Sequence, residues 1–275
     1  MTGPPDPTAA GDGAPDLTAY LRRIGYSGEL SATRATLDAL HLAHVTSIPF
    51  ENLDILQGVP IRLDLASLQA KLVSSRRGGY CFEQNTLFAA VLEHIGFRVT
   101  RLAARVRYGT DRVLPRTHMA LRIDLDGTRL LADVGFGAEG LLFPVPLDGS
   151  VSRQFAWTYR AIEDGGARLL QSWGGEAWED LYAFTFEPQL PVDYEIANYY
   201  TSTHRASRFT QVLTAQRLAP DVRRILRNRD YLEIRGGTVD TRVIHDDDEL
   251  VSLLAETFGL VFPAGTRFKY DQGAG

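Results

Sequence analysis

The spacing of apolar residues divides the chain into a helical first part and a strand-rich second part. Residues 16–24 and 65–72 carry apolar side chains at helical spacing, as do residues 33–45 and a longer segment that ends at Gly96. From Phe97 onward, apolar and polar residues alternate in short runs, which is typical of β-strands. This change of period predicts an α+β fold in which a group of helices precedes an antiparallel barrel or a strongly bent sheet.

A hairpin is predicted where Asp126-Gly127 separates two alternating runs. A two-residue turn pairs Leu125 with Thr128. In this register one face is wholly apolar and is expected to be the core face: Met119, Leu121, Ile123, Leu125, Leu130, Ala132 and Val134. His118 and Asp133 share the opposite face as diagonal neighbours, roughly 7–8 Å apart at the backbone, which is within reach of an imidazole and a carboxylate. The alternative is that both side chains simply point to solvent.

The residue pattern in the second half of the chain predicts further strands and helices. Strands are expected around residues 155–162, 167–173 and 182–186, before two prolines end the sheet. The elements predicted beyond them are a helix over 194–200, a short helical turn over 221–227, a hairpin around Gly236-Gly237, and a last helix that begins after the aspartates 246–248 and ends at Gly259.

Composition and charge exclude several classes of function. The 275 residues carry a net charge of −5 without a basic block, so a nucleic-acid partner is not expected. No apolar run approaches the roughly 18 residues that span a bilayer, and residues 1–15, rich in Pro and Gly, resemble a disordered tail rather than a signal peptide. A single cysteine excludes an internal disulfide and fits a reducing compartment. The sequence therefore predicts a soluble cytoplasmic protein.

Metal and nucleotide sites are not predicted. The sequence contains no phosphate-binding loop, dinucleotide fingerprint or zinc pattern. His41 and His44 are three residues apart, but no third ligand accompanies them, so histidines of the core or of a helix surface are the preferred interpretation. We expect neither a metal ion nor a prosthetic group.

Cys81 stands at the start of a predicted helix, directly after the turn Gly78-Gly79 and Tyr80. Free N–H groups and the positive dipole at a helix N-terminus stabilise a thiolate, and glycine lets the backbone come close to a ligand. The alternative is an inert thiol, because a lone cysteine is commonly a small apolar residue of the core. His118 and Asp133 favour the nucleophile, since an imidazole can take the thiol proton and a carboxylate can orient the imidazole. These three residues can carry an acyl group, to water or to an amine, with the Cys81 N–H stabilising the oxyanion.

Several motifs resemble those of the arylamine N-acetyltransferases. His118 lies 37 residues after Cys81, and Asp133 lies 15 residues after His118, which fits that family. The resemblance covers about residues 16–263 and rests on segments 48–55 (IPFENLDI), 77–85 (RGGYCFEQN), 134–137 (VGFG), 197–204 (ANYYTSTH) and 207–209 (SRF). One departure is Arg205, where many members have proline.

The resemblance implies three domains and a cysteine-protease-like Cys-His-Asp site. The domains are a helical bundle with the nucleophile over residues 16–95, an antiparallel β-barrel with the histidine and the aspartate over 96–205, and an α/β lid over 206–275. Residues 1–15 remain a disordered tail. The catalytic triad of the family corresponds to Cys81, His118 and Asp133.

The resemblance also implies a reaction and its partners. Acetyl-CoA acylates Cys81, CoA leaves, and an arylamine, a hydrazine or an N-hydroxyarylamine accepts the acetyl group in a ping-pong cycle of xenobiotic metabolism. Phe50 and Phe136 correspond to residues that line the acceptor pocket, and Phe209 corresponds to a region that contacts CoA. The role of Phe136 requires the preceding strand to end before it, because strict alternation puts Phe136 on the core face. The expected partners are these small molecules, with a homodimer as a possible assembly.

Three alternatives stay open at this level. An amide synthase that closes a macrolactam would keep the same fold and triad. A thiol hydrolase of protease or transglutaminase type would need an open groove, and the papain-type cysteine signature is absent. A catalytically silent binding module would have no need of all three triad residues.

Overall fold

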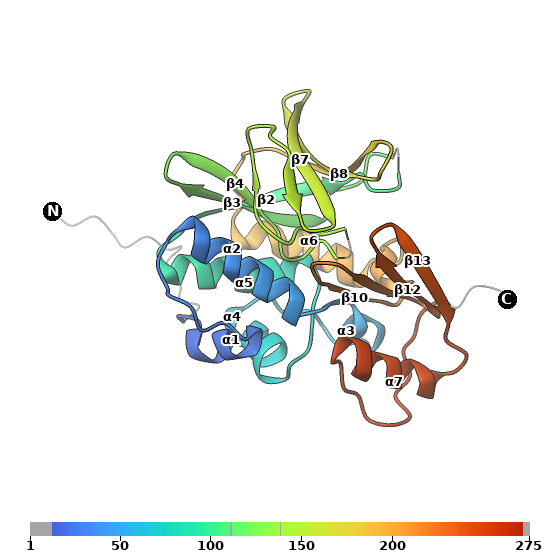
Figure 1. Ribbon diagram of the computed structural model, residues 1–275. Helices are drawn as coiled ribbons and strands as arrows, with labels where there is room; N and C mark the ends of the chain where they lie inside the picture. The colour runs from blue at the N-terminus through green and yellow to red at the C-terminus, as the bar shows by residue number, and fades with distance from the viewer. Residues whose placement is uncertain (1–12, 111, 138, 272–275) are drawn as a thin grey trace.

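The computed structural model describes residues 13–110, 112–137 and 139–271 (Figure 1). An eight-stranded and a five-stranded antiparallel sheet are assembled around a group of helices. The disordered tail expected over residues 1–15 lies outside the described residues, apart from its last three positions.

The helices of the first part begin and end where the capping residues indicate. Asp16 accepts a hydrogen bond from the Ala19 N–H, and Gly25 ends the first helix in the left-handed conformation. The Thr33 side chain caps the second helix. The elements in order are α1 (Leu17–Ile24), α2 (Arg34–Ser47), β1 (Phe50–Glu51), α3 (Leu53–Leu56), α4 (Leu65–Leu68), a π-helix (Gln69–Ser74) and α5 (Cys81–Ile95). The single helix expected over residues 65–72 is therefore an α-turn that continues as a π-helix.

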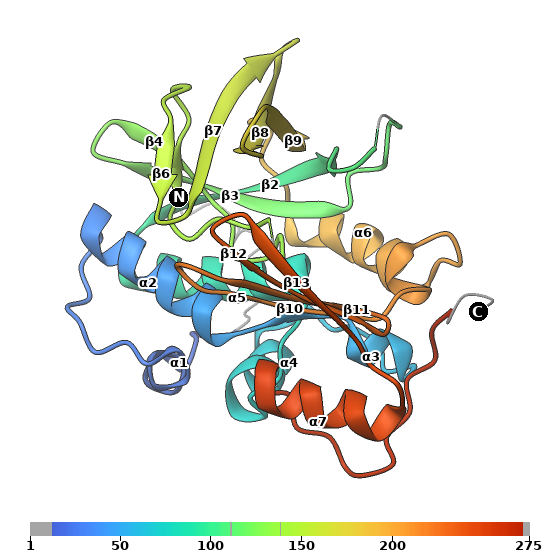
Figure 2. The same ribbon diagram turned by 45° about the vertical axis from the view of Figure 1, so that its right-hand side comes forward.

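The expected antiparallel barrel is confirmed. Its strands follow the order β5-β4-β3-β2-β9-β8-β7-β6 and curve above the helices (Figures 1 and 2). The strands are β2 (Arg98–Val106), β3 (His118–Leu125), β4 (Thr128–Ala132), β5 (Val145–Pro146), β6 (Ser152–Gln154), β7 (Trp157–Asp164), β8 (Ala167–Trp173) and β9 (Trp178–Phe184).

The predicted register of the β3–β4 hairpin is confirmed. Leu125 pairs with Thr128, and both turn residues have positive φ, 49° at Asp126 and 75° at Gly127, as a type I′ turn requires. The predicted apolar face packs on α5 and its neighbours in the largest core. However, part of the opposite face is also buried, because Ala120 and Leu131 pack inside the barrel in a second core, whereas Arg129 near the turn is exposed. Bending the sheet into a barrel covers part of a face that alternation alone cannot mark as buried.

The second sheet joins distant parts of the chain. Its order is β1-β10-β11-β12-β13, so β1 from the first part pairs with β10, with Phe50 opposite Gln216. Helix α7 packs on this sheet on the side away from the barrel (Figure 2). The remaining elements are α6 (Pro191–Thr203), a 3₁₀ helix (Arg208–Thr210), β10 (Thr214–Leu218), β11 (Arg223–Arg227), β12 (Asp230–Arg235), β13 (Thr238–Val243) and α7 (Asp247–Phe258).

One secondary-structure prediction is wrong. The segment 221–227, expected to form a helical turn, contains strand β11. Ile225 pairs with Gln216 of β10 on one side and with Leu232 of β12 on the other. A strand as short as β11, with five residues, fits the helical and the strand period equally well. Hydrogen bonding to two neighbouring strands decides its conformation.

Candidate active site

Cys81 is the first residue of α5, and its side chain is buried. The Gly78-Gly79 turn holds this helix start against the strand segment around Phe50. The Glu51 N–H donates to Gly79 O at 3.1 Å, and a Cβ on Gly78 would stand 2.2 Å from Pro49 O. Glycine is required here because the two backbones touch. In the described part of the chain, the N–H of Cys81 has no hydrogen-bond partner.

His118 and Asp133 form a buried pair. His118 Nε2 lies 2.7 Å from Asp133 Oδ2, and both side chains are almost wholly enclosed. Burial alone would lower the pKa of His118, but the charge of Asp133 and its hydrogen bond raise it well above the usual value, with a smaller contribution from Cys81. Burial would likewise raise the pKa of Asp133, but the imidazolium charge holds it below the usual range. The pair is therefore a carboxylate and an imidazolium at neutral pH.

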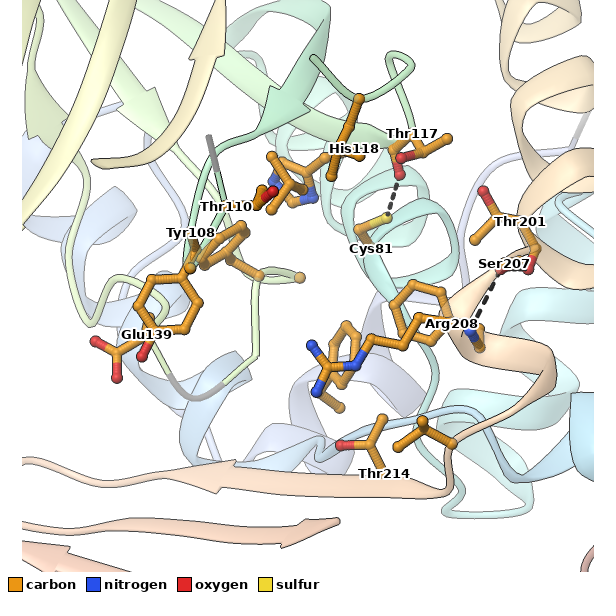
Figure 3. A pocket seen from close by; sticks show the side chains of 18 of the residues that line it. Cys81, Tyr108, Thr110, Thr117, His118, Glu139, Thr201, Ser207, Arg208 and Thr214 are labelled. Carbon is orange, nitrogen blue, oxygen red and sulfur yellow. Dashed lines mark hydrogen bonds between the residues drawn. The ribbon is translucent and has the colours of Figure 1, made fainter. Parts of the chain in front are cut away.

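The three predicted catalytic residues are brought together. Because Nε2 of His118 faces Asp133, Nδ1 is the nitrogen left for Cys81, and the nearby thiol contributes to the raised pKa of His118. The thiol also lies 3.6 Å from Thr117 O (Figure 3). This arrangement allows proton transfer between Sγ and Nδ1 while the carboxylate holds the opposite edge of the imidazole.

The predicted register placed Asp133 on the second strand of the hairpin, but the structure places it after that strand. Strand pairing in the hairpin ends at Leu121 and Ala132, so Asp133 belongs to the segment after β4, and His118 pairs instead with Ala104 of β2. Phe136 also lies beyond the strand, as its proposed role requires. Its ring stands edge-on to His118 with centroids 5.1 Å apart.

Two residues that the sequence did not assign to the site hold Asp133 in place. Asn85 donates to Asp133 Oδ1 at 2.9 Å and accepts from the Val134 N–H at 3.1 Å. His41 Nε2 accepts the Asp133 N–H at 3.2 Å, while His41 Nδ1 lies 3.0 Å from Leu142 O. Asn85 lies one helical turn after Cys81, which was an available signal. His41 is buried, which is one of the two positions expected for it, the core or a helix surface, but its contact with the site had no sequence signal.

Gly135 lets the segment after β4 rest on the nucleophile helix. A Cβ at this position would stand 2.7 Å from Cys81 Cα and 3.1 Å from Cys81 O. Glycine at position 135 is thus required for a backbone contact with the helix start.

A buried group of charges supports the loop before Cys81. Arg77 contacts Glu51 Oε1 and Asp54 Oδ1, each at 2.8 Å. Lys71, from the π-helix, lies 2.7 Å from Glu83 Oε1, and Glu83 Oε2 accepts the Tyr80 N–H at 3.1 Å. These contacts tie the first turn of α5 to the helices below it.

A pocket of about 450 Å³ opens beside the thiol. Phe50, Phe136 and Phe209, the three residues expected to contact substrates, all line it, as do Cys81 and His118. The helical part, the barrel and the second sheet all contribute to its walls. Within residues 13–110, 112–137 and 139–271, no cluster of three potential metal ligands is present, and no helix of this part is long and apolar enough to cross a membrane.

Comparisons with known proteins agree with this geometry. Residues 33–266 match the profile of a family described as N-acetyltransferase. An arylamine N-acetyltransferase of Mycolicibacterium smegmatis is 39% identical over 90% of this chain and 92% of its own length. The structure of the Nocardia farcinica arylamine N-acetyltransferase superposes with a TM-score of 0.88 at 39% identity, covering 94% of this chain and 95% of the other.

Two further similarities concern the substrates. The Mycobacterium marinum arylamine N-acetyltransferase in complex with CoA superposes with a TM-score of 0.85 at 36% identity, over 89% of this chain and 93% of the other. A proansamycin X synthase of Amycolatopsis mediterranei is 30% identical over 87% of this chain and 95% of its own length.

Proposed function

Because the chain belongs to the arylamine N-acetyltransferase family, we propose that it transfers the acetyl group of acetyl-CoA to an arylamine, a hydrazine or an N-hydroxyarylamine through acetyl-Cys81. The protein is an acyltransferase. One observation carries the proposed residue roles: Cys81, His118 and Asp133 form a continuous line whose Cys81 end faces an aromatic-lined pocket.

The first half-reaction acylates Cys81. The thiolate attacks the thioester carbonyl, and the Cys81 N–H at the start of α5 stabilises the oxyanion of the tetrahedral intermediate. As this intermediate collapses, the bond to the CoA sulfur breaks, and the His118 imidazolium gives its proton to that sulfur. Acetyl-Cys81, free CoA and a neutral His118 remain.

The second half-reaction returns the enzyme to its starting state. The nitrogen of the acceptor attacks the acetyl-Cys81 carbonyl, and neutral His118 takes the proton that this nitrogen loses. The carbon–sulfur bond of acetyl-Cys81 then breaks, which restores the thiolate and the imidazolium. Asp133 keeps the ring in one orientation throughout and stabilises its charged form.

The pocket walls support the substrate roles. Phe50 and Phe136 present aromatic surfaces beside Cys81, which suit the ring of an arylamine, and Phe209 lies against Phe50 with ring centroids 6.0 Å apart. We assign Phe50 and Phe136 to the acceptor and Phe209 to the acyl-CoA. We also assign residues 16–95, 96–205 and 206–275 to the helical, barrel and lid domains.

The decisive experiment separates the half-reactions. Purified protein mixed with acetyl-CoA in the absence of an amine should release one CoA per chain in a burst, and peptide mass spectrometry should locate one acetyl group on Cys81. Addition of 4-anisidine should discharge this group as the acetylated amine. The proposal fails if no acetyl group is found on Cys81, or if Cys81→Ala gives the same burst.

The same experiment tests the alternatives. A thiol hydrolase would discharge acetyl-Cys81 to water at the same rate with and without the amine. An amide synthase would leave small arylamines unacetylated and would act only on a long acyl chain that carries its own amine. The higher identity to the acetyltransferase than to the proansamycin X synthase, 39% against 30%, favours acetyl transfer.

A further inference from the structure

Three arginines line the pocket and, within the described residues, have no ion-pair partner: Arg112, Arg208 and Arg227. Arg208, in the short 3₁₀ helix, and Arg227, at the end of β11, both line the cavity. Within the described residues, neither guanidinium takes part in a side-chain hydrogen bond or an ion pair. By contrast, the carboxylate of Glu139 in the same pocket lies 2.6 Å from Arg223 and is already neutralised.

Arg208 and Arg227 are both exposed residues, so water solvates their guanidinium groups when no ligand is bound. The side chain of Arg208 reaches into the cavity from the segment that also carries Ser207 (Figure 3). Partial burial lowers the pKa of Arg208 first, and the positive charge of Arg227 lowers it further. An anion placed between the two guanidinium groups would relieve this repulsion and would be held by paired N–H donors.

We propose that Arg208 and Arg227 form an anion-binding pair that holds a negatively charged group of a substrate. This inference rests on the proposed acetyl transfer. The anion is a group with two or more equivalent oxygens, such as a carboxylate on the arylamine or the diphosphate of the acyl-CoA. The aromatic walls beside Cys81 would hold the uncharged part of the same molecule, so the pair sets a preference for acidic over neutral substrates.

Four substrate combinations distinguish the two sources of the anion. The donors are acetyl-CoA and S-acetylpantetheine, which lacks the phosphates, and the acceptors are 4-aminobenzoate and 4-aminobenzamide, which differ in charge. In a ping-pong cycle, kcat/KM for the donor reports only the first half-reaction, and kcat/KM for the acceptor reports only the second. Arg208→Gln and Arg227→Gln are compared with Arg205→Gln, because Arg205 is equally exposed and belongs to the same segment as Arg208 but does not line the pocket.

We expect Arg208→Gln to lower kcat/KM at least about tenfold for the anionic substrate that the pair holds, since the substitution removes charge-assisted hydrogen bonds to that anion. Arg227→Gln should act in the same direction, and Arg205→Gln should change nothing. If kcat/KM falls for 4-aminobenzoate but not for 4-aminobenzamide, the anion is on the acceptor. If it falls for acetyl-CoA but not for S-acetylpantetheine, the anion is on the donor. Arg208→Lys keeps the charge without the planar fork and should restore part of the loss.

Two results would overturn the anion pair. One is unchanged kcat/KM in both glutamine variants with all four combinations, and the other is an equal loss with charged and neutral substrates at an unchanged melting temperature. Acetyl transfer itself is checked separately by the wild-type protein with S-acetylpantetheine and 4-aminobenzamide. Turnover of that neutral pair leaves the proposed function intact whatever the arginine variants do.

Discussion

Gly135→Ala tests whether contact between the segment after β4 and the start of α5 sets the catalytic geometry. The new Cβ would lie 2.7 Å from Cys81 Cα, whereas ordinary contact begins at 3.4 Å, so one backbone must retreat by about 0.7 Å. Neither side is a flexible side-chain end, because the nearest atom belongs to the helix backbone. The displacement separates Asp133 and its histidine from the nucleophile, and a misplacement of about 1 Å can cost roughly a hundredfold in rate.

We therefore expect Gly135→Ala to lower kcat about 10- to 100-fold. Overpacking should also lower the free energy of unfolding by about 1–3 kcal/mol, seen as a lower melting temperature. The assay combines steady-state acetylation of 4-anisidine with thermal unfolding followed by circular dichroism. Gly174→Ala is the matched control, because its Cβ would meet only the flexible end of Glu179, at 2.8 Å. A Gly135→Ala enzyme with kcat within twofold of wild type and an unchanged melting temperature would refute the reasoning.

Three further predictions concern the triad and the buried histidines. Cys81→Ser should lower kcat at least about a thousandfold while keeping the fold. Iodoacetamide should inactivate the wild type at one label per chain. If the serine variant turns over within about tenfold of wild type, Cys81 is not the nucleophile. Asp133→Asn should lower kcat at least about a hundredfold, since the same change in a serine triad costs roughly 10⁴. Alkylation of the thiol should also begin at higher pH than in wild type. A folded variant whose alkylation rate has the same pH profile as wild type would contradict the orienting role. Burial lowers the pKa of His41 to about 4 and of His44 to about 3, so the unfolded chain binds more protons below about pH 6.5. Each histidine should therefore lower the free energy of unfolding by about 1.4 kcal/mol per pH unit from about pH 6.5 down to its folded pKa. In urea unfolding at pH 7.5, 6 and 5, the free energy of unfolding should fall less steeply with decreasing pH in His44→Gln than in wild type.

The buried histidines illustrate how a local pattern can identify a residue class without its role. The sequence predicted that they are residues of the core or of a helix surface and not metal ligands, and the structure places both in the core. His44 Nε2 lies 3.0 Å from Gln84 Oε1, and its Nδ1 lies 2.8 Å from the Tyr20 hydroxyl. These partners lie 40 and 24 residues away in sequence, so no short motif could indicate them.

Local sequence determined the elements whose ends depend on nearby residues. The caps of α1 and α7 and the Asp126-Gly127 turn are chosen by backbone preferences within a few residues, and the alternation around that turn leaves one register that buries the apolar face. Nearby residues likewise predicted that Cys81 lies at the start of a helix. The likeness of its motif to a known family then supplied the reaction, which periodicity alone could not.

The tertiary structure decided everything that depends on segments meeting across long distances in sequence. β1 joins β10, the segment after β4 touches α5 at Gly135, and Arg208 and Arg227 line the same pocket as Cys81. The bending of the sheet into a barrel also buried part of the second face of the hairpin, at Ala120 and Leu131. Local preferences restrict φ and ψ, but they carry no information about which distant surface supplies the partner. Burial of apolar area and pairing of buried polar groups select those contacts, and both depend on the whole chain at once.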